Sequence, residues 1–213
     1  MKALIPNFIT VINLLCGTLA ILCSFGGYID YVPYLVLGGF VADFLDGFVA
    51  RALNVTSPMG KELDSLADMI SFGLLPGIIM YHLLNYGLTG AWSVPFNLFH
   101  APAALIMAAF AAIRLAKFNV DERESDSFYG IPTPTTAAFV TALLCIALFG
   151  ERAILNETLF SASILWGITV FASIMMVVDF PMISNKIKDK SLSANRVKIL
   201  MLAIVAILSL IHI

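Results

Sequence analysis

The sequence predicts an all-α integral membrane protein, a polytopic bundle of about seven transmembrane helices. Of its 213 residues, 60% are hydrophobic and only 12% are charged, about half the charged share of roughly 25% that soluble domains carry. The mean hydropathy is +0.95. No strand periodicity, low-complexity tract or soluble domain interrupts the apolar segments, so residues 1–213 are treated as a single membrane domain.

Seven apolar segments approach the length of about 20 residues that crosses a bilayer as a helix. In chain order they cover residues 8–26, 32–53, 61–84, 101–118, 134–149, 159–178 and 197–213. The fifth and the seventh are short by this criterion, so the number of spans stays approximate. The third carries Gly73, Pro76 and Gly77, which predict a kink midway along it.

Four aspartates stand at fixed intervals near the ends of the second and third segments: Asp43, Asp46, Asp64 and Asp68. On insertion scales an intramembrane carboxylate costs about 2.5–3.5 kcal/mol, so four without compensation would cost about 10 kcal/mol. Only two basic residues lie nearby in the sequence. Bound metal is therefore the natural source of compensating charge.

Helix geometry supports this interpretation. Asp43 and Asp46 are three residues apart in the sequence (i and i+3). Asp64 and Asp68 are i and i+4, so each pair lies on one face of its helix. The connector at 53–59 is short enough to make the two helices antiparallel neighbours. Carboxylate oxygens suit hard cations such as Mg²⁺ or Mn²⁺, and four of them suit a two-metal site for phosphoryl displacement.

The distribution of basic residues predicts the orientation in the membrane. With the N-terminus inside, eleven of the twelve Lys and Arg residues fall on the inner side, and only Arg152 falls outside. The four aspartates then face the cytoplasm. The three histidines, His82, His100 and His212, fall on the outer side. A histidine nucleophile beside the aspartates is therefore not expected.

The first segment carries polar residues at intervals of three, Asn7, Thr10 and Asn13, which share one helix face. Interhelical hydrogen bonding and a role in ligand binding explain such residues about equally well. Arg114, near the inner end of the fourth segment, allows the same two interpretations: its side chain reaches the membrane surface, or it pairs with an anionic group of a ligand.

The acidic stretch resembles the signature of the CDP-alcohol phosphotransferase family. The pattern Asp-x2-Asp-Gly-x2-Ala-Arg-x8-Gly-x3-Asp-x3-Asp is met in full across residues 43–68. Its fixed positions are Asp43, Asp46, Gly47, Ala50, Arg51, Gly60, Asp64 and Asp68. Eight fixed residues at fixed gaps make a specific signal.

Two further stretches resemble the phosphatidylserine synthase branch of that family, the integral-membrane (type II) CDP-diacylglycerol–serine O-phosphatidyltransferases. One is the Pro-Asn-x2-Thr-x2-Asn start at residues 6–13, and the other is the Phe-x-Gly-x-Pro-x-Pro run at residues 128–134. The resemblance implies transfer of the phosphatidyl group from CDP-diacylglycerol to the hydroxyl of L-serine, with release of phosphatidylserine and CMP. It also implies a six-helix core followed here by a C-terminal span, a multi-pass location in the inner (cytoplasmic) membrane, and a homodimer.

The resemblance assigns roles to particular residues. Two divalent cations, Mg²⁺ or Mn²⁺, would be held by Asp43, Asp46, Asp64 and Asp68, and Asp68 would also be the general base. The CDP-lipid would contact Asn7, Thr10, Asn13, Asp46, Gly47, Ala50, Arg51 and Gly60. The acceptor would contact Arg114, Lys117, Gly130 and Pro132.

Other interpretations stay open at this stage. Glycerol 3-phosphate or inositol phosphate as the acceptor would call for a basic pocket, for which only Arg114 and Lys117 obviously qualify. An archaeal ether-lipid donor would undergo the same chemistry. The interpretation from another class is an ion or proton transporter, because intramembrane carboxylates mark ion pathways. The position of the aspartates at one face, rather than through the midplane, opposes it.

Overall fold

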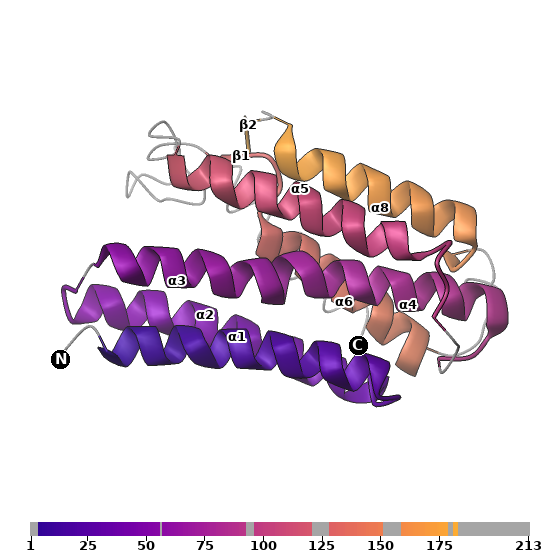
Figure 1. The fold of residues 1–213 in the computed structure, drawn as a ribbon, viewed down its shortest axis with the longest axis horizontal. Coiled ribbons are helices and arrows are strands. Elements are labelled where there is room, and N and C mark those ends of the chain that lie inside the picture. The colour runs from indigo at the N-terminus through magenta and orange to yellow at the C-terminus, as the bar shows by residue number, and fades with distance from the viewer. Residues whose placement is uncertain are drawn as a thin grey trace, which may run out of the picture.

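A computed structural model describes residues 4–55, 57–92, 96–120, 128–150, 159–178 and 181–182 (Figure 1). In chain order, the elements are α1 (Leu4–Phe25), the 3-10 helix η1 (Ile29–Tyr31), α2 (Val32–Ala52), α3 (Pro58–Asp68), the π-helix η2 (Met69–Leu74), α4 (Leu75–Thr89), α5 (Ala101–Val120), β1 (Phe128–Tyr129), α6 (Thr133–Phe149), α8 (Ala162–Val177) and β2 (Pro181–Met182).

The first six predicted segments are helices in the structure, and the seventh lies outside the described residues. Four continuous helices, 4–25, 29–52, 58–89 and 101–120, are long and apolar enough to cross a membrane, whereas α6 and α8 are apolar but shorter. One small correction concerns β-structure. No strand was expected, yet β1 and β2 form an antiparallel pair of two residues each, with Phe128 opposite Met182. Such a short pair has too few residues to show strand periodicity.

The continuous run of α3, η2 and α4 forms the central rod of the bundle (Figure 1). Helices α1 and α2 pack together along one side of it, α5 and α8 pack together along the other, and α6 contacts α4 and η2. This position explains why every residue from Leu75 to Asn85 is buried. The π-helical stretch begins directly after Asp68, in the region where Gly73 and Pro76 predicted a departure from regular helix.

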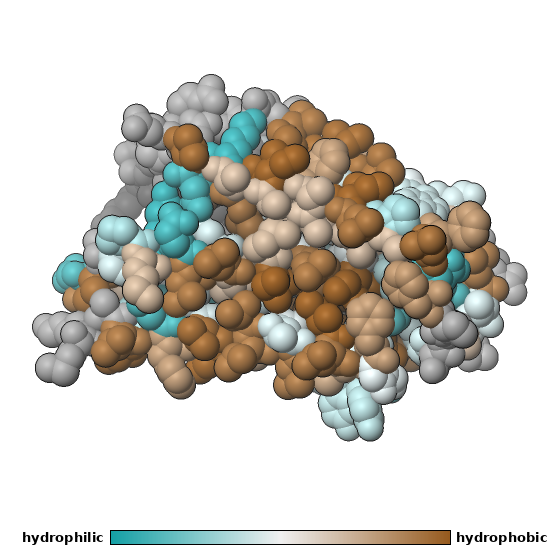
Figure 2. Space-filling model, viewed as in Figure 1, coloured by the Kyte–Doolittle hydropathy of each residue, from teal (hydrophilic) through white to brown (hydrophobic). Residues whose placement is uncertain are grey.

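The outer surface of the bundle is strongly apolar. Large hydrophobic side chains such as Leu15, Leu22, Phe44 and Leu105 are more than half exposed. Figure 2 shows hydrophobic residues across the middle of the molecule, with hydrophilic residues gathered towards its two ends. Together with the long apolar helices, this surface indicates a membrane-embedded protein.

The connector between α2 and α3 is shaped by local sequence. Asn54 takes a left-handed conformation with φ of 51°, which asparagine tolerates better than most residues. Ser57 is the N-cap of α3, and its Oγ accepts a hydrogen bond from the Gly60 amide at 3.0 Å. Pro58 occupies the first turn of α3, where its missing amide hydrogen is not needed. These residues begin α3 at the same end of the bundle where α2 ends.

Close contact between α4 and α5 leads to a stability prediction. A Cβ built on Gly77 would lie 2.8 Å from both the Cα and the carbonyl oxygen of Ala104. Gly77→Ala is therefore expected to lower the free energy of unfolding by about 1–3 kcal/mol, because backbone atoms of α5 must move. Thermal unfolding in detergent measures this loss of stability. Gly167→Ala in α8 is the matched control, since nothing lies within 4 Å of its added Cβ; an equal loss in both variants would contradict the prediction.

Candidate metal centre and adjoining cavity

Three of the four signature aspartates come together where α2 faces α3. Carboxylate oxygens of Asp43, Asp64 and Asp68 all lie within 4.8 Å of one another, and the three residues are partly buried. Asp64 and Asp68 project from one face of α3, as their spacing predicts. The cluster therefore joins side chains that are more than twenty positions apart in the sequence.

The oxygens of this cluster fit a hard divalent cation. Oxygens bound to one Mg²⁺ ion lie at most about 4.2 Å apart, because each Mg–O distance is about 2.0–2.1 Å. Separations up to 4.8 Å are close to this limit. In addition, Asp64 Oδ1 is buried and has no hydrogen-bond partner among the described residues. A buried carboxylate oxygen without a partner is costly, and a bound cation would satisfy it.

Asp46 lies outside the three-carboxylate set, although it is close enough to interact electrostatically with Asp64. Its side chain is only 6% exposed, and its Oδ2 lies 2.6 Å from the Thr10 hydroxyl. The same hydroxyl lies 3.1 Å from the Pro6 carbonyl oxygen, and its single hydrogen can be donated to one of the two acceptors. Asp46 is thus held by Thr10 of α1 beside the cluster of three.

Asn13 on α1 contacts the cluster directly. Its Nδ2 donates a hydrogen bond to Asp68 Oδ1 at 3.3 Å, and its backbone carbonyl accepts one from Ser71 Oγ at 3.0 Å. Asn13 is fully buried. Asn13 and Thr10 both make interhelical hydrogen bonds, which is one of the two roles that the sequence left open for this face of α1. Ser71, within the π-helix, was not anticipated, since nothing in the local pattern distinguishes it.

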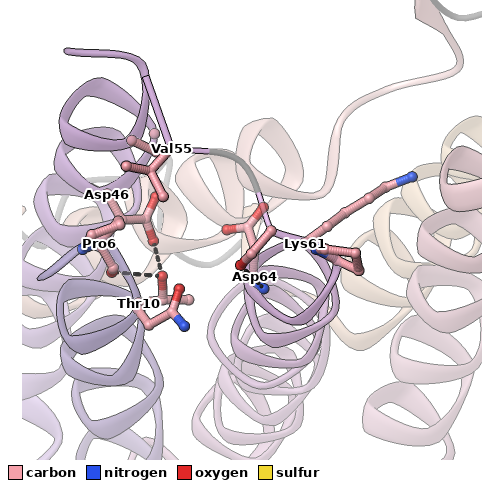
Figure 3. Close-up of a pocket in the computed structure, with 12 residues that line it drawn as sticks. Pro6, Thr10, Asp46, Val55, Lys61 and Asp64 are labelled. Carbon is pink, nitrogen blue, oxygen red and sulfur yellow. Dashed lines mark hydrogen bonds between the residues drawn. The ribbon is translucent and has the colours of Figure 1, made fainter. Parts of the chain in front are cut away.

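A cavity of about 560 Å³ adjoins the cluster and opens between α1, α2 and α3 (Figure 3). Its lining residues are Pro6, Asn7, Thr10, Asp46, Gly47, Ala50, Val55, Ser57, Pro58, Gly60, Lys61 and Asp64. Figure 3 shows Asp46 and Asp64 on opposite sides of this space. Helix α1 packs extensively against both α2 and α3, and the cavity opens where the three helices meet.

Six of the eight residues predicted to contact a CDP-lipid line this cavity, whereas Asn13 and Arg51 do not. Small side chains form part of the wall, and a Cβ on Gly60 would lie 3.1 Å from Asn7 Oδ1 and 3.0 Å from Ser57 Oγ. Arg51 packs back on its own helix, where a Cβ on Gly47 would lie 3.3 Å from its Nη1.

A hydrogen-bonded link between α3 and α5 was missed by the sequence reasoning. Lys61 Nζ donates to the carbonyl oxygen of Asn119 at 3.2 Å, and Asn119 Nδ2 donates to Ser65 Oγ at 2.9 Å. Figure 3 shows the amine of Lys61 directed away from Asp46. The place of Lys61 three residues before Asp64 was the available signal, because this spacing puts it on the same helix face.

The four residues predicted to contact the acceptor do not line the cavity. Arg114 is buried within α5, and Lys117 lies one turn further along the helix. Gly130 has φ of 70°, and an added Cβ would lie 2.6 Å from the Met176 carbonyl oxygen. Pro132 is the N-cap residue of α6. The last two therefore belong to a turn that packs against α8.

The described histidines lie away from the cluster, as the sequence predicted. His82 lies in the middle of α4. His100 directly precedes α5, and its Nδ1 lies 3.2 Å from Asn85 Oδ1. His212 lies outside the described residues. The candidate metal ligands found in the described part of the chain are all aspartates.

Comparison with known proteins gives a consistent result. A family model described as CDP-alcohol phosphatidyltransferase matches residues 3–174. A Helicobacter pylori (strain J99) protein named CDP-diacylglycerol–serine O-phosphatidyltransferase is 34% identical over 176 residues, which cover 82% of this chain and 69% of that protein. A Bacillus subtilis protein of the same name is 37% identical over 130 residues, or 61% of this chain and 69% of the relative.

An archaeal protein is also similar. The archaetidylserine synthase of Methanothermobacter thermautotrophicus is 29% identical over 149 residues, which cover 69% of this chain and 60% of that protein. The chain thus spans about six to seven tenths of the length of these relatives.

Proposed function

Because the chain belongs to the CDP-alcohol phosphatidyltransferase family, we propose that it transfers the phosphatidyl group of CDP-diacylglycerol to the hydroxyl of L-serine. The products are phosphatidylserine and CMP. The observation that carries the proposal is the complete signature at residues 43–68, three of whose aspartates meet beside a cavity. The names of the similar proteins support serine as the acceptor.

The cavity is the site proposed for the cytidine diphosphate head of the donor. Its volume of about 560 Å³ falls within the range of about 300–1,000 Å³ typical of small-molecule sites. Gly47, Ala50 and Gly60 let a flat ring approach the backbone closely, while Asn7 and Thr10 supply polar atoms. Arg51 is the group proposed to pair with the diphosphate. The acyl chains of the donor would remain in the membrane beside the apolar surface of the bundle.

Asp43, Asp46, Asp64 and Asp68 are the residues proposed to hold two divalent cations, Mg²⁺ or Mn²⁺. When bound, such ions neutralise the charge of the diphosphate and stabilise the departing CMP. The chain's own contribution is to collect the carboxylates and to orient two of them from α1, through Thr10 and Asn13.

Asp68 is the proposed general base. A serine hydroxyl is a weak nucleophile unless its proton is removed as the new bond forms. Asp68 accepts that proton while the serine oxygen bonds to the lipid-side phosphorus. The bond from this phosphorus to the oxygen bridging to CMP breaks, and CMP leaves with the electron pair. The transfer is direct, with no covalent enzyme intermediate.

The acceptor is proposed to enter from the cytoplasm, near the end of α5. The link from Lys61 and Ser65 to Asn119 joins that end of α5 to the helix carrying the base. Arg114, Lys117, Gly130 and Pro132 stay the proposed acceptor contacts. A cytoplasmic active site in the inner membrane, a seventh span at 197–213 and a homodimer complete the proposal.

An ether-linked CDP-lipid is a second candidate for the donor. The archaeal relative is named as a synthase of archaetidylserine, so an ether-linked CDP-lipid is an alternative donor for the same chemistry. Both donors carry the cytidine diphosphate head that the cavity would receive. The difference lies in the lipid tails, which would contact the apolar outer surface.

The test of the proposed function is CMP release by purified protein in detergent. CDP-diacylglycerol is supplied with Mn²⁺ or Mg²⁺, and serine, glycerol 3-phosphate and inositol phosphate are offered in parallel. CMP release is expected only in the reaction that contains serine. If CMP is released with a different acceptor, that acceptor replaces serine in the proposal. No release with any acceptor, from folded protein that binds metal, would refute the proposal and favour an ion pathway.

Asn13→Ala is expected to lower kcat by about 10–100-fold, the usual effect of losing a group that orients a metal ligand. The KM for CDP-diacylglycerol should change little, because Asn13 contacts Asp68 and not the cavity. Steady-state kinetics of CMP release measure both. Thr18→Ala, at an exposed position of the same helix, is the control. A large rise in the KM for CDP-diacylglycerol with a normal kcat would instead indicate that Asn13 contacts the CDP-lipid.

Arg114→Lys is expected to raise the KM for serine by about tenfold while the KM for CDP-diacylglycerol stays unchanged. Lysine keeps the positive charge but loses the two-pronged geometry with which arginine binds a carboxylate. Initial rates with each substrate varied in turn measure the effect. An unchanged KM for serine would remove Arg114 from the acceptor site.

A further inference from the structure

Asp68 and Ser71 of the central rod both form hydrogen bonds to one residue of α1. Asn13 Nδ2 donates to Asp68 Oδ1 at 3.3 Å, and Ser71 Oγ donates to the backbone carbonyl oxygen of Asn13 at 3.0 Å. Asp68 and Ser71 are only three positions apart in the chain. The two hydrogen bonds therefore hold the side chain and the backbone of Asn13 against one short stretch of the rod, which begins at the proposed base.

The hydrogen bond from Ser71 to Asn13 is buried and crosses between two helices. Asn13 is 0% exposed and Ser71 is 2% exposed. The hydroxyl groups of Thr18, Thr169 and Ser173 each bond to a carbonyl oxygen four residues earlier in their own helix, which is a common arrangement for such side chains. Ser71 donates to a different helix instead, so its hydrogen bond fixes the position of η2 relative to α1.

Gly17 on α1 allows η2 to come this close. It lies four residues after Asn13, which is about one helical turn. A Cβ built on Gly17 would overlap Ser71 Oγ and would lie 2.8 Å from the Cα of Ser71. Any side chain at this position would push the backbone of η2 away from α1. The hydrogen bond from Ser71 to Asn13 therefore depends on glycine at position 17.

The π-helix η2 joins the part of the rod that carries the aspartates to the part that is buried in the core. It begins directly after Asp68 and contains Ser71. A π-helical turn closes with i→i+5 hydrogen bonds, so it holds one more residue than an α-helical turn and changes the rotation of α3 relative to α4. Packing fixes α4, in which every residue from Leu75 to Asn85 is buried. A contact within η2 then fixes the turn that leads back to Asp68.

We propose that Ser71 and Gly17 are positioning residues for Asp68 that act through Asn13. Ser71 holds the backbone of Asn13 against η2, and the side-chain amide of Asn13 holds the Asp68 carboxylate where it meets the other aspartates of the cluster. Gly17 contributes by having no side chain. Neither Ser71 nor Gly17 lines the cavity beside the cluster, so a direct contact with the CDP-lipid is not part of their role. The kinetic consequences of this inference rest on the proposed function, whereas its consequence for metal binding does not.

Ser71→Ala is expected to lower kcat for CMP release by about three- to tenfold, the range that one neutral hydrogen bond usually supplies. The KM for CDP-diacylglycerol should stay unchanged. The half-saturating concentration of Mn²⁺ should rise, because a ligand that is less well oriented binds metal less tightly. Steady-state CMP release measures all three quantities. Thr18→Ala removes a hydroxyl that bonds only within α1, and it should change none of them.

A double-mutant cycle separates positioning through Asn13 from a general structural role. Ser71→Ala is introduced into the Asn13→Ala variant, which has no side-chain amide to hold Asp68. In that background, Ser71→Ala should change kcat by less than about twofold, because residues that act as one unit are not additive. If Ser71→Ala instead lowers kcat by the same factor in both backgrounds, Ser71 does not act through Asn13 and the proposal is overturned.

Gly17→Ala and Gly77→Ala form a matched pair of substitutions. In each, the added Cβ would lie 2.8 Å from a Cα of the neighbouring helix, that of Ser71 or that of Ala104, so both variants should melt at a lower temperature. Only Gly17→Ala should also lower the kcat of the folded protein, by about 10–100-fold, as expected when a metal ligand loses its orienting partner. An equal loss of kcat in the two variants would mean that Gly17 has no specific role.

The effect of Mn²⁺ on the melting temperature tests the inference without any measurement of CMP release. A ligand that binds only the folded protein raises its melting temperature. Ser71→Ala should reduce the rise that a given Mn²⁺ concentration produces, and Thr18→Ala should not. If the unmodified protein releases no CMP, the proposed function fails, yet a reduced rise in Ser71→Ala still supports the positioning role. An equal rise in Ser71→Ala and in the unmodified protein would overturn that role.

Discussion

Asp68→Asn is expected to reduce kcat for CMP release by about 10²–10⁴-fold, the usual contribution of a general base. Asparagine keeps the size of the side chain and an oxygen that can still accept the hydrogen bond from Asn13, which spans 3.3 Å. It cannot take up the proton of the serine hydroxyl. The loss should therefore appear in kcat, with binding of CDP-diacylglycerol close to that of the unmodified protein.

The measurement has to separate a lost base from a weakened metal site. CMP release is followed while Mn²⁺ is raised well above the concentration that saturates the unmodified protein. If the kcat of Asp68→Asn stays low at high Mn²⁺, the result supports Asp68 as the general base. Full recovery would show that Asp68 serves only as a metal ligand, and near-normal kcat at ordinary Mn²⁺ would exclude it from catalysis. Asp30→Asn, an exposed aspartate at the opposite end, is the control.

Asp43→Asn is expected to raise the half-saturating concentration of Mn²⁺ by at least about tenfold, more than Asp46→Asn does. Asp43 belongs to the set of oxygens within 4.8 Å of one another, and replacing one charged ligand weakens the hold on a hard cation. Asp46 lies outside that set and is engaged by Thr10 at 2.6 Å. Equal shifts for the two variants would contradict the division seen in the structure.

Thermal unfolding, which does not depend on enzymatic activity, gives a second test of whether Asp43 binds the metal. A ligand that binds only the folded protein raises its melting temperature, so Mn²⁺ should stabilise the unmodified protein, and Asp43→Asn much less. Without metal, Asp43→Asn should melt at a higher temperature than the unmodified protein, because it relieves repulsion between neighbouring carboxylates. A Tm that Mn²⁺ shifts equally in both proteins would remove Asp43 from the metal site.

The spacing of residues along the chain was sufficient for much of the fold and part of the site. The lengths of the apolar segments predicted six helices that the structure describes. The i, i+4 spacing predicted that Asp64 and Asp68 share a face of α3, although that helix begins at Pro58 and not near residue 61, where the apolar segment was expected to start. Both predictions follow from contacts between residues close in sequence, which helix geometry alone determines.

Several features of the site depend on how the helices pack. Asn13 and Asp68 are separated by 55 positions, and Asn119 and Ser65 by 54. No local periodicity states how far apart two helices stand or how each is rotated about its axis. The cavity opens where α1, α2 and α3 meet, so it depends on how α1 packs against the other two helices.

By itself, the sequence determined that this chain is a membrane helix bundle with the family's eight-residue signature, because hydropathy and helical spacing are properties of short stretches. Only the tertiary structure decided that Asp46 stands apart from the other three aspartates, that Asn13 contacts Asp68, and that Ser71 contacts the backbone of Asn13. Each of these depends on interhelical distances and rotations, which arise from side-chain packing over the whole bundle.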